Sequence, residues 1–356
     1  MEGRAGDRGG CATNVRCLWL GGCRRRRAAV HPAKRKGGGG VSTATATPVA
    51  GELKEALQRA AGDGTVVEPD FPLAEWTTLR AGGRADFFAE PESEAGLSAL
   101  LAACRERGVP VTMLGRGSNF LPLDSGVRGL TVRLGRELFT GIEPDGTRLR
   151  CGAGARMKAV AAEAKRNCLA GMEFLEGIPG SLGGGLRMNA GAMGSELFDV
   201  VESVRLMDPD GAVFEMPAES IEVAYRSCPL LKNQIALGAV LKGVPDTAEA
   251  IAARMAGFAE QRWGSQPRAR SAGCIFKNPE SIPAGKLVDE LGLKGATEGG
   301  AMVSEEHGNF IINNGGATAD DVLRLIGRIR EQALTERGIE LQTEVQIIGG
   351  REARGD

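Results

Sequence analysis

The stretch "GIPGSLGGGLRMNAGAMGSEL", Gly177–Leu197, contains seven glycines in 21 residues, and only Arg187 and Glu196 are charged. Glycine lets backbone approach a neighbour closely and exposes its N–H groups. Such a segment either lines a large, flat ligand or is disordered. The apolar residues within and beside it favour order, so the stretch predicts a ligand-lining backbone.

A second glycine loop lies upstream. "LGRGSN", Leu114–Asn119, follows the strand-like "VPVTML". Its backbone N–H groups could surround phosphate oxygens, and Ser118 and Asn119 would add side-chain donors. The loop matches neither a dinucleotide fingerprint nor a Walker loop. By spacing alone, a plain turn between strands explains it as well as a phosphate cradle does.

The composition describes a globular protein and excludes several function classes. The 356 residues are 42% hydrophobic and 25% charged, which suits two or three domains. A single tyrosine argues against a base-stacking surface for nucleic acid. No CxxC pair occurs and the two histidines are far apart, so no metal site is expected. No apolar run is long enough to span a membrane, and the scattered cysteines favour a reducing cytoplasm.

The first 50 residues differ from the rest. They hold ten Arg or Lys against two acidic residues, a balance of +8, which leaves −9 for the remainder (−1 minus 8). We expect residues 1–50 to form a disordered basic leader with no part in the chemistry. A transit peptide or a nucleic-acid-binding arm is the alternative interpretation.

Periodicity predicts an α+β chain. Asp-Gly turns between alternating apolar residues predict two β-hairpins, and apolar spacing predicts helices over 94–107, 155–168 and 247–263. A further helix begins after Thr318, a capping residue, and stops at Gly338. We expect a glycine-rich part over 51–245, a smaller part over 246–350 and a short tail over 351–356.

The order of the motifs is more specific than any one of them. "LGRGSN", the long glycine run, "VAYRSCPLL", "SAGCIFKNP" and "LQTEVQIIG" follow one another in this order. Together they resemble the UDP-N-acetylenolpyruvylglucosamine reductases, over about residues 65–350, and in particular the shorter branch that lacks a tyrosine-bearing lid loop. The resemblance implies a two-subdomain FAD-binding domain of the vanillyl-alcohol-oxidase type and a C-terminal α+β substrate domain.

The resemblance also implies a reaction and its residues. Noncovalent FAD would be the cofactor and NADPH the co-substrate, and a UDP-sugar enol ether would be reduced to UDP-N-acetylmuramate for peptidoglycan, without nucleic-acid or membrane partners. Arg226 would hold the substrate carboxylate, Cys274 would donate a proton and Glu344 would assist. The substrate would also contact Tyr225, Lys277, Asn278 and Lys286. FAD would be bound by Gly115, Gly117, Ser118, Asn119, Gly177, Ile178, Pro179, Gly180, Ser181, Gly183, Asn189, Ala190 and Gly191.

Cys274 departs from many relatives, which place serine at this position. A thiol with its ordinary pKa of about 8.5 is protonated at neutral pH and is a stronger acid than an alcohol. An inert buried cysteine is the alternative. Two rival functions are a different FAD oxidoreductase on the same scaffold and a non-catalytic UDP-sugar-binding protein. All four of Arg226, Cys274, Asn278 and Glu344 are present, which argues against both.

Overall fold

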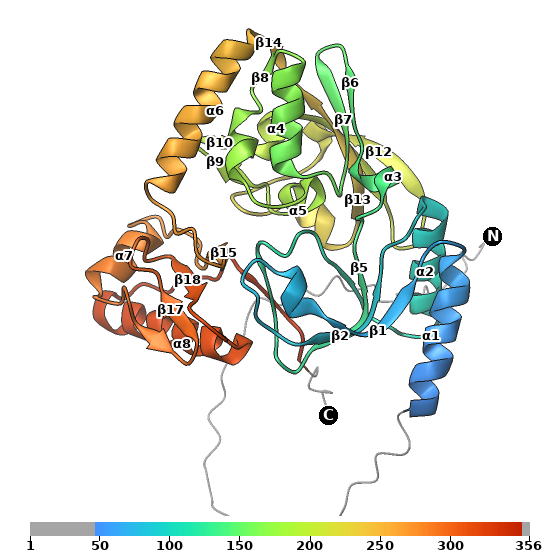
Figure 1. Ribbon diagram of the computed structural model, residues 1–356, viewed down its shortest axis with the longest axis horizontal. Helices are drawn as coiled ribbons and strands as arrows, with labels where there is room; N and C mark the ends of the chain where they lie inside the picture. Colours follow the sequence, from blue (N-terminus) through green and yellow to red (C-terminus); the bar gives the residue numbers. More distant parts are fainter. Residues whose placement is uncertain (1–46, 351–356) are drawn as a thin grey trace, which may run out of the picture.

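The computed structural model describes residues 47–350, with side chains from Gly51 onward. Three α+β parts meet around a common centre (Figure 1). The leader over 1–46 and the tail over 351–356 lie outside the described residues. Helix α1 (Thr47–Ala61) begins inside the expected leader, and Pro48 in its first turn suits a helix start.

The first part is a mixed four-stranded sheet in the order β1-β2-β5-β3. β1 pairs antiparallel with β2, whereas β2 and β3 both pair parallel with β5. Helices α1 and α2 pack beside it (Figure 1). The bounds are β1 (Val67–Pro72), β2 (Arg84–Ala89), α2 (Glu94–Glu106), β3 (Val111–Met113) and β5 (Val127–Val132).

The second part is a five-stranded antiparallel sheet in the order β12-β11-β13-β7-β6. The short helix α5 carries the middle of the long glycine stretch against this sheet. The bounds are β6 (Ile142–Asp145), β7 (Arg148–Gly152), α4 (Met157–Arg166), α5 (Leu182–Arg187), β11 (Val201–Met207), β12 (Val213–Pro217), β13 (Ile235–Lys242) and α6 (Ala248–Trp263).

The third part is a four-stranded antiparallel sheet in the order β15-β18-β17-β16, with helix α8 against it. Thr318 and Asp321 form a capping box at the start of α8, and Gly338 ends the helix in the left-handed conformation. The bounds are β15 (Ser271–Cys274), α7 (Ala284–Glu290), β16 (Thr297–Glu298), β17 (Ala301–Val303), β18 (Phe310–Asn313) and α8 (Ala319–Arg337).

The last strand leaves the third part. β19 (Gln346–Ile348) pairs parallel with β4 (Phe120–Pro122), which directly follows the first glycine loop. The isolated bridge between Phe276 and Thr343 holds the preceding residues beside the third part. The segment just before β19 therefore runs between the third part and β4.

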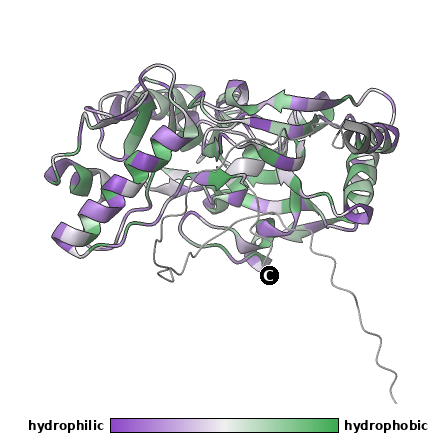
Figure 2. Ribbon diagram, turned by 90° about the horizontal axis from the view of Figure 1, so that it is seen from below, coloured by the Kyte–Doolittle hydropathy of each residue, from purple (hydrophilic) through white to green (hydrophobic). Residues whose placement is uncertain are grey.

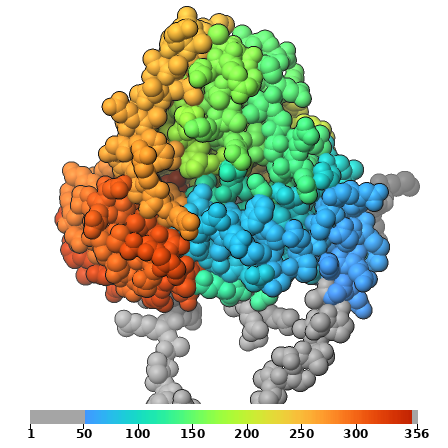
Figure 3. Space-filling view, viewed as in Figure 1, coloured from blue at the N-terminus to red at the C-terminus, as the bar shows by residue number. Residues whose placement is uncertain are grey.

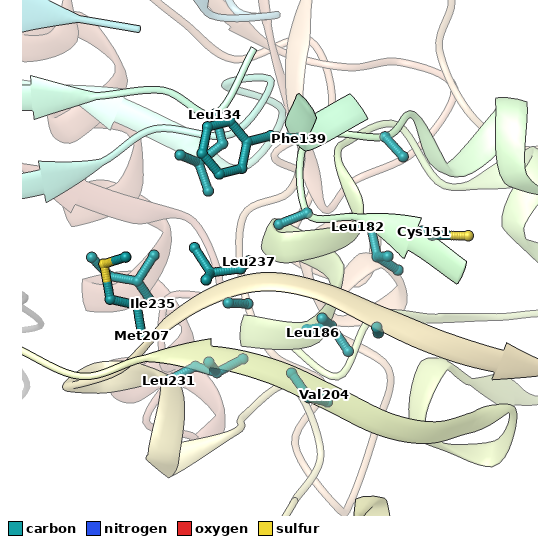
Figure 4. Close-up of a cluster of buried hydrophobic side chains, with 14 of the residues drawn as sticks. Leu134, Phe139, Cys151, Leu182, Leu186, Val204, Met207, Leu231, Ile235 and Leu237 are labelled. Carbon is teal, nitrogen blue, oxygen red and sulfur yellow. The ribbon is translucent and has the colours of Figure 1, made fainter. Parts of the chain in front are cut away.

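Each part buries apolar side chains. One continuous core underlies the first and second parts, and Figure 4 shows a portion of it, including Leu134, Phe139, Leu182 and Leu237. A separate cluster fills the third part. In Figure 2, green segments gather on the inner strands, while purple alternates with green along the outer helices. Amphipathic elements of this kind are stabilised mainly by burial of their apolar faces.

The predicted elements agree closely with the structure. Both hairpins form, as β6–β7 and β11–β12, and the four predicted helical segments are α2, α4, α6 and α8. Apolar spacing places Ile251, Met255 and Phe258 on one face of α6, but only Ile251 is buried, while Met255 and Phe258 are partly covered. Within residues 47–350, no helix is long and apolar enough to cross a membrane.

Candidate active site

A large cavity lies where the three parts meet. Its volume is about 1150 Å³, and Figure 3 shows a hollow between the blue, green and orange parts of the surface. Both glycine loops line it, together with β15 and the residues before β19. Since pockets for drug-sized ligands measure roughly 300–1,000 Å³, this cavity has room for a ligand as large as a dinucleotide.

The first glycine loop packs so closely that glycine is required at one position. Gly117 has φ +63°, and a Cβ there would lie 2.2 Å from the carbonyl oxygen of Trp76. Thr78 holds the same loop, because its backbone N–H donates to the Gly117 carbonyl at 3.0 Å. The Thr78 hydroxyl donates to the Ser271 carbonyl at 2.6 Å, which connects the loop to β15.

The two polar side chains of this loop differ from expectation. Ser118 Oγ donates to the Pro179 carbonyl at 2.6 Å, and Asn119 Nδ2 donates to the Glu344 carbonyl at 3.1 Å. Both residues line the cavity, yet the Ser118 hydroxyl and one of the two N–H donors of Asn119 already have protein partners. The loop therefore offers mainly backbone N–H groups to a ligand, and its side chains join the first part to the second glycine loop and to the segment before β19.

Arg226 and Glu344 come together on the cavity wall. Arg226 Nε donates to Glu344 Oε1 at 3.2 Å, and Arg226 Nη2 donates to the Gly191 carbonyl at 3.1 Å. The exposed fractions of the two side chains are only 20% and 16%. Arg226 adopts φ +55°, which is uncommon outside glycine and typical of functional sites.

Cys274 lies on the same wall, at the end of β15. The preceding Gly273 has φ +75°, a conformation that side-chain-bearing residues rarely adopt, and it passes close to the Ser118 carbonyl. Beyond Cys274, the Ile275 carbonyl accepts a hydrogen bond from the Glu344 backbone N–H at 2.8 Å. These backbone contacts place the thiol, the carboxylate and the guanidinium in one corner of the cavity.

Burial sets the protonation of this corner. It raises the pKa of the Cys274 thiol to about 12, with help from the Glu344 carboxylate and against the opposing effect of Arg226. The thiol is thus protonated at neutral pH, as expected, although it is a weaker acid than an unburied cysteine. Burial also raises the pKa of Glu344, while the Arg226 charge and hydrogen bond act in the opposite direction.

The cavity wall contains nearly all the residues predicted to bind FAD. Asn189 is the exception: it is buried behind the wall, where Nδ2 donates to Glu196 at 2.7 Å and Oδ1 accepts from the Phe198 N–H at 3.2 Å. Its side chain holds the loop between α5 and β11, so contact with a ligand in this cavity is not supported.

The residues predicted to contact substrate lie off the wall. Tyr225 is exposed, and its ring packs under the Arg226 guanidinium at 4.8 Å. Asn278 Oδ1 accepts from the Ala284 N–H at the start of α7. Lys286 is largely exposed beside Glu290, and Lys277 is close enough to lower the pKa of Glu344. Tyr225 and Lys277 thus lie next to the Arg226–Glu344 pair, whereas Asn278 and Lys286 lie at α7.

Three arginines on the cavity wall were not among the predicted site residues. Arg116 lies in the first glycine loop, and its pKa is lowered by burial and by the neighbouring charges of Arg156 and Arg133. Arg133 pairs with Glu90, but within residues 47–350 neither Arg116 nor Arg156 has a carboxylate partner. A cationic group of this kind beside exposed backbone N–H groups fits a diphosphate, so the cavity suits FAD. The three residues are too far apart in sequence for any motif to join them.

Known proteins resemble this chain over most of its length. It is 42% identical over 283 residues to the UDP-N-acetylenolpyruvoylglucosamine reductase of Heliobacterium modesticaldum, covering 78% of this chain and 89% of that protein. The protein of the same name from Anaeromyxobacter dehalogenans is 44% identical, covering 79% and 85% respectively. The chain belongs to the UDP-N-acetylenolpyruvoylglucosamine reductase family.

Family models and a solved structure agree with this membership. Residues 266–348 match the C-terminal domain of UDP-N-acetylenolpyruvoylglucosamine reductase, and residues 85–217 match an FAD binding domain. The crystal structure of the reductase from Thermus caldophilus is 38% identical, has a TM-score of 0.71 and covers 80% of this chain and all of its own. The expected α+β fold with an FAD-binding domain is confirmed, and the UDP-N-acetylenolpyruvoylglucosamine reductase family uses FAD as cofactor.

Proposed function

We propose that this chain is an NADPH-driven, FAD-dependent reductase that converts the enolpyruvyl ether of UDP-N-acetylglucosamine to UDP-N-acetylmuramate. The observation that carries the proposal is the meeting of Arg226, Glu344 and Cys274 in one corner of a cavity lined by two glycine loops. Family membership supports the same substrate, and it supports peptidoglycan precursor synthesis as the pathway. A reducing cytoplasm is the compartment we propose.

FAD, when bound, supplies hydride transfer between NADPH and the substrate double bond. Overall, a hydride that originates from NADPH and one proton from solvent add across the double bond of the enol ether, and NADP⁺ is released. The protein must therefore hold the substrate carboxylate, stabilise the negative charge that develops on it and deliver the proton to the neighbouring carbon.

Arg226 is the residue we assign to the carboxylate. A guanidinium has five N–H donors, of which two are used by Glu344 and Gly191. Arg226 Nη1 also lies 3.8 Å from Glu196 Oε1, too far for a hydrogen bond, so donors remain for a substrate oxygen. Glu344 keeps the guanidinium in its orientation. The Tyr225 ring beneath Arg226 supports the same orientation from the outer side.

Cys274 is the residue we assign to proton donation. Its thiol is protonated at neutral pH because burial raises its pKa to about 12. The Arg226 charge opposes that rise and would stabilise the thiolate left after transfer. Solvent then returns the proton, which balances the reaction.

One experiment tests the proposed function directly. Purified protein should oxidise NADPH rapidly only when the UDP-enolpyruvyl sugar is present. Mass spectrometry should then detect one UDP-N-acetylmuramate for each NADPH consumed. In deuterated water, solvent deuterium should appear on the carbon that carries the carboxylate. Binding of the sugar without NADPH oxidation would favour the non-catalytic alternative. Reduction of the FAD-loaded protein by an alcohol or a sugar, with no NADPH present, would favour a different oxidoreductase.

A further inference from the structure

The rim of the cavity carries an arginine stacked on a tryptophan. Trp263 ends α6, is 44% exposed and lines the cavity. The guanidinium carbon of Arg268 lies 5.0 Å from the centre of its ring. Both residues belong to the segment that runs from α6 to β15, and this segment leads to Cys274.

The two arginines beside Trp263 differ in what their N–H groups do. Arg262 also packs on the ring, at 4.7 Å, but its Nη1 donates to the Gly177 carbonyl, so it anchors the end of α6 to the second glycine loop. Arg268 is exposed and lines the cavity, and within residues 47–350 the Trp263 ring is its only partner.

A guanidinium stacked through its face keeps its in-plane donors free. Cation–π contact through the ring face holds the guanidinium in place without using its N–H donors, which remain available to an anion. This arrangement is preorganised for an anion with several oxygens, such as a phosphate. Arg270 adds a second exposed cation two residues further along the same rim.

We propose that Arg268, oriented by Trp263, binds a phosphate group of the nucleotide that enters the cavity. Two nucleotide substrates follow from the proposed function on which this inference rests: NADPH, through its 2′-phosphate, and the UDP-sugar, through its diphosphate. Both present the same chemistry, a phosphate attached to a nucleoside. Arg268 and Trp263 are therefore specificity-determining residues of the cavity entrance.

Binding probes separate the two sources without relying on turnover. FAD-loaded protein is titrated calorimetrically with adenosine 2′,5′-bisphosphate, which mimics one end of NADPH, and with UDP. Arg268→Ala should weaken binding of one probe by about tenfold or more, as expected for loss of a charge-assisted hydrogen bond. Loss with the bisphosphate assigns the site to NADPH, and loss with UDP assigns it to the sugar nucleotide.

Matched variants distinguish a specific phosphate site from a nonspecific effect of removing one positive charge. Arg330→Ala removes an exposed arginine of α8 that does not line the cavity. Trp263→Leu keeps an apolar side chain but removes the aromatic face, and it should weaken the same probe as Arg268→Ala. If NADPH is the source, Arg268→Ala should also lower the ratio of kcat/KM for NADPH to that for NADH.

The outcomes keep this inference separate from the proposed function. Equal binding of both probes by Arg268→Ala and Arg330→Ala would overturn the phosphate site, even with full turnover of the parent protein. Conversely, weaker binding of one probe by Arg268→Ala, with unchanged binding by Arg330→Ala, would support the site. It would do so even if the parent protein failed to reduce the enolpyruvyl sugar.

Discussion

Arg226 and Glu344 form a partly buried ion pair at 3.2 Å, although 118 residues of sequence separate them. Arg226 belongs to the loop before β13, and Glu344 to the segment before β19. The pair is therefore the point where the second part of the fold meets the last residues of the described chain. Its geometry depends on both, which makes it a sensitive position for mutation.

Glu344→Gln should slow turnover with the enolpyruvyl sugar by about 10–100-fold, because Arg226 loses a charged hydrogen-bond partner. The oxidation of NADPH in the absence of sugar develops no charge on a substrate carboxylate. Stopped-flow absorbance should therefore show flavin reduction by NADPH at the parental rate and slower reoxidation by the sugar. Equal slowing of both phases would indicate a general structural defect.

Cys274→Ala should slow reoxidation by roughly 10²–10⁴-fold, the range that general acid catalysis contributes. Cys274→Ser should recover part of that loss, because a hydroxyl can donate a proton from the same position. Stopped-flow traces of both variants provide the comparison. Reoxidation of the alanine variant at the parental rate would show that Cys274 only packs and that another group supplies the proton.

Alkylation should report the environment of the Cys274 thiol. Iodoacetamide reacts with the thiolate, and burial raises the pKa of Cys274 to about 12, so labelling at neutral pH should be slow and should accelerate as the pH rises toward 10. Peptide mass mapping can follow Cys274 beside Cys168, which is exposed. The UDP-enolpyruvyl sugar should protect Cys274 and leave Cys168 unprotected. Labelling of Cys274 as fast as Cys168 at neutral pH would contradict this environment.

Glu344 should also affect the pH dependence of stability. Its folded pKa is raised above the ordinary value of 4.5, so the folded protein binds more protons here than the unfolded chain does. Its contribution to stability is fully present below the ordinary pKa of 4.5 and is lost as the pH rises from there through the raised folded pKa. Urea unfolding at stepwise pH should show Glu344→Gln gaining stability relative to the parent protein across this window. The opposite slope would mean that the ion pair outweighs burial.

Asn309→Ala should destabilise the segment that directly follows Cys274 and β15. The buried Asn309 side chain donates to the Phe276 carbonyl and accepts from the Phe276 N–H, both at 2.8 Å. Its loss leaves two backbone groups unpaired, which costs about 1–3 kcal/mol each. Urea unfolding should reveal this cost, and the exposed Asn233→Ala serves as the control. A change as small as in that control would show that water replaces the side chain.

The helices and hairpins were predicted well because the residues that start, end or turn them lie within the element or next to it. The capping residue Thr318, the stop at Gly338 and the Asp-Gly turns act within a few residues, and each forms as expected. The alternating sequence "IELQTEVQIIGG", Ile339–Gly350, predicts a final strand, which in the structure is limited to Gln346–Ile348. Glu344, just before it, instead pairs its N–H with Ile275 and its carbonyl with Asn119.

Only the site residues that belong to sequence motifs were predicted. Motif order identified Arg226, Cys274 and Glu344, and the structure places all three on one wall. The arrangement of Arg116, Arg133 and Arg156 depends on how strands from different parts are brought together, and no spacing in the chain encodes it. The same holds for Trp263 and Arg268, whose stacking depends on where α6 ends.

The pairing of β19 with β4 has a consequence for biosynthesis. The hydrogen bond between Asn119 and Glu344 joins residues 225 positions apart, so the ribosome must add those 225 residues after Asn119 before this contact can form. Domains that emerge earlier fold as units, while contacts of such long separation form late. A nascent chain stalled before Glu344 would therefore lack both β19 and the carboxylate that pairs with Arg226, so such a partial product should be enzymatically silent rather than partly active.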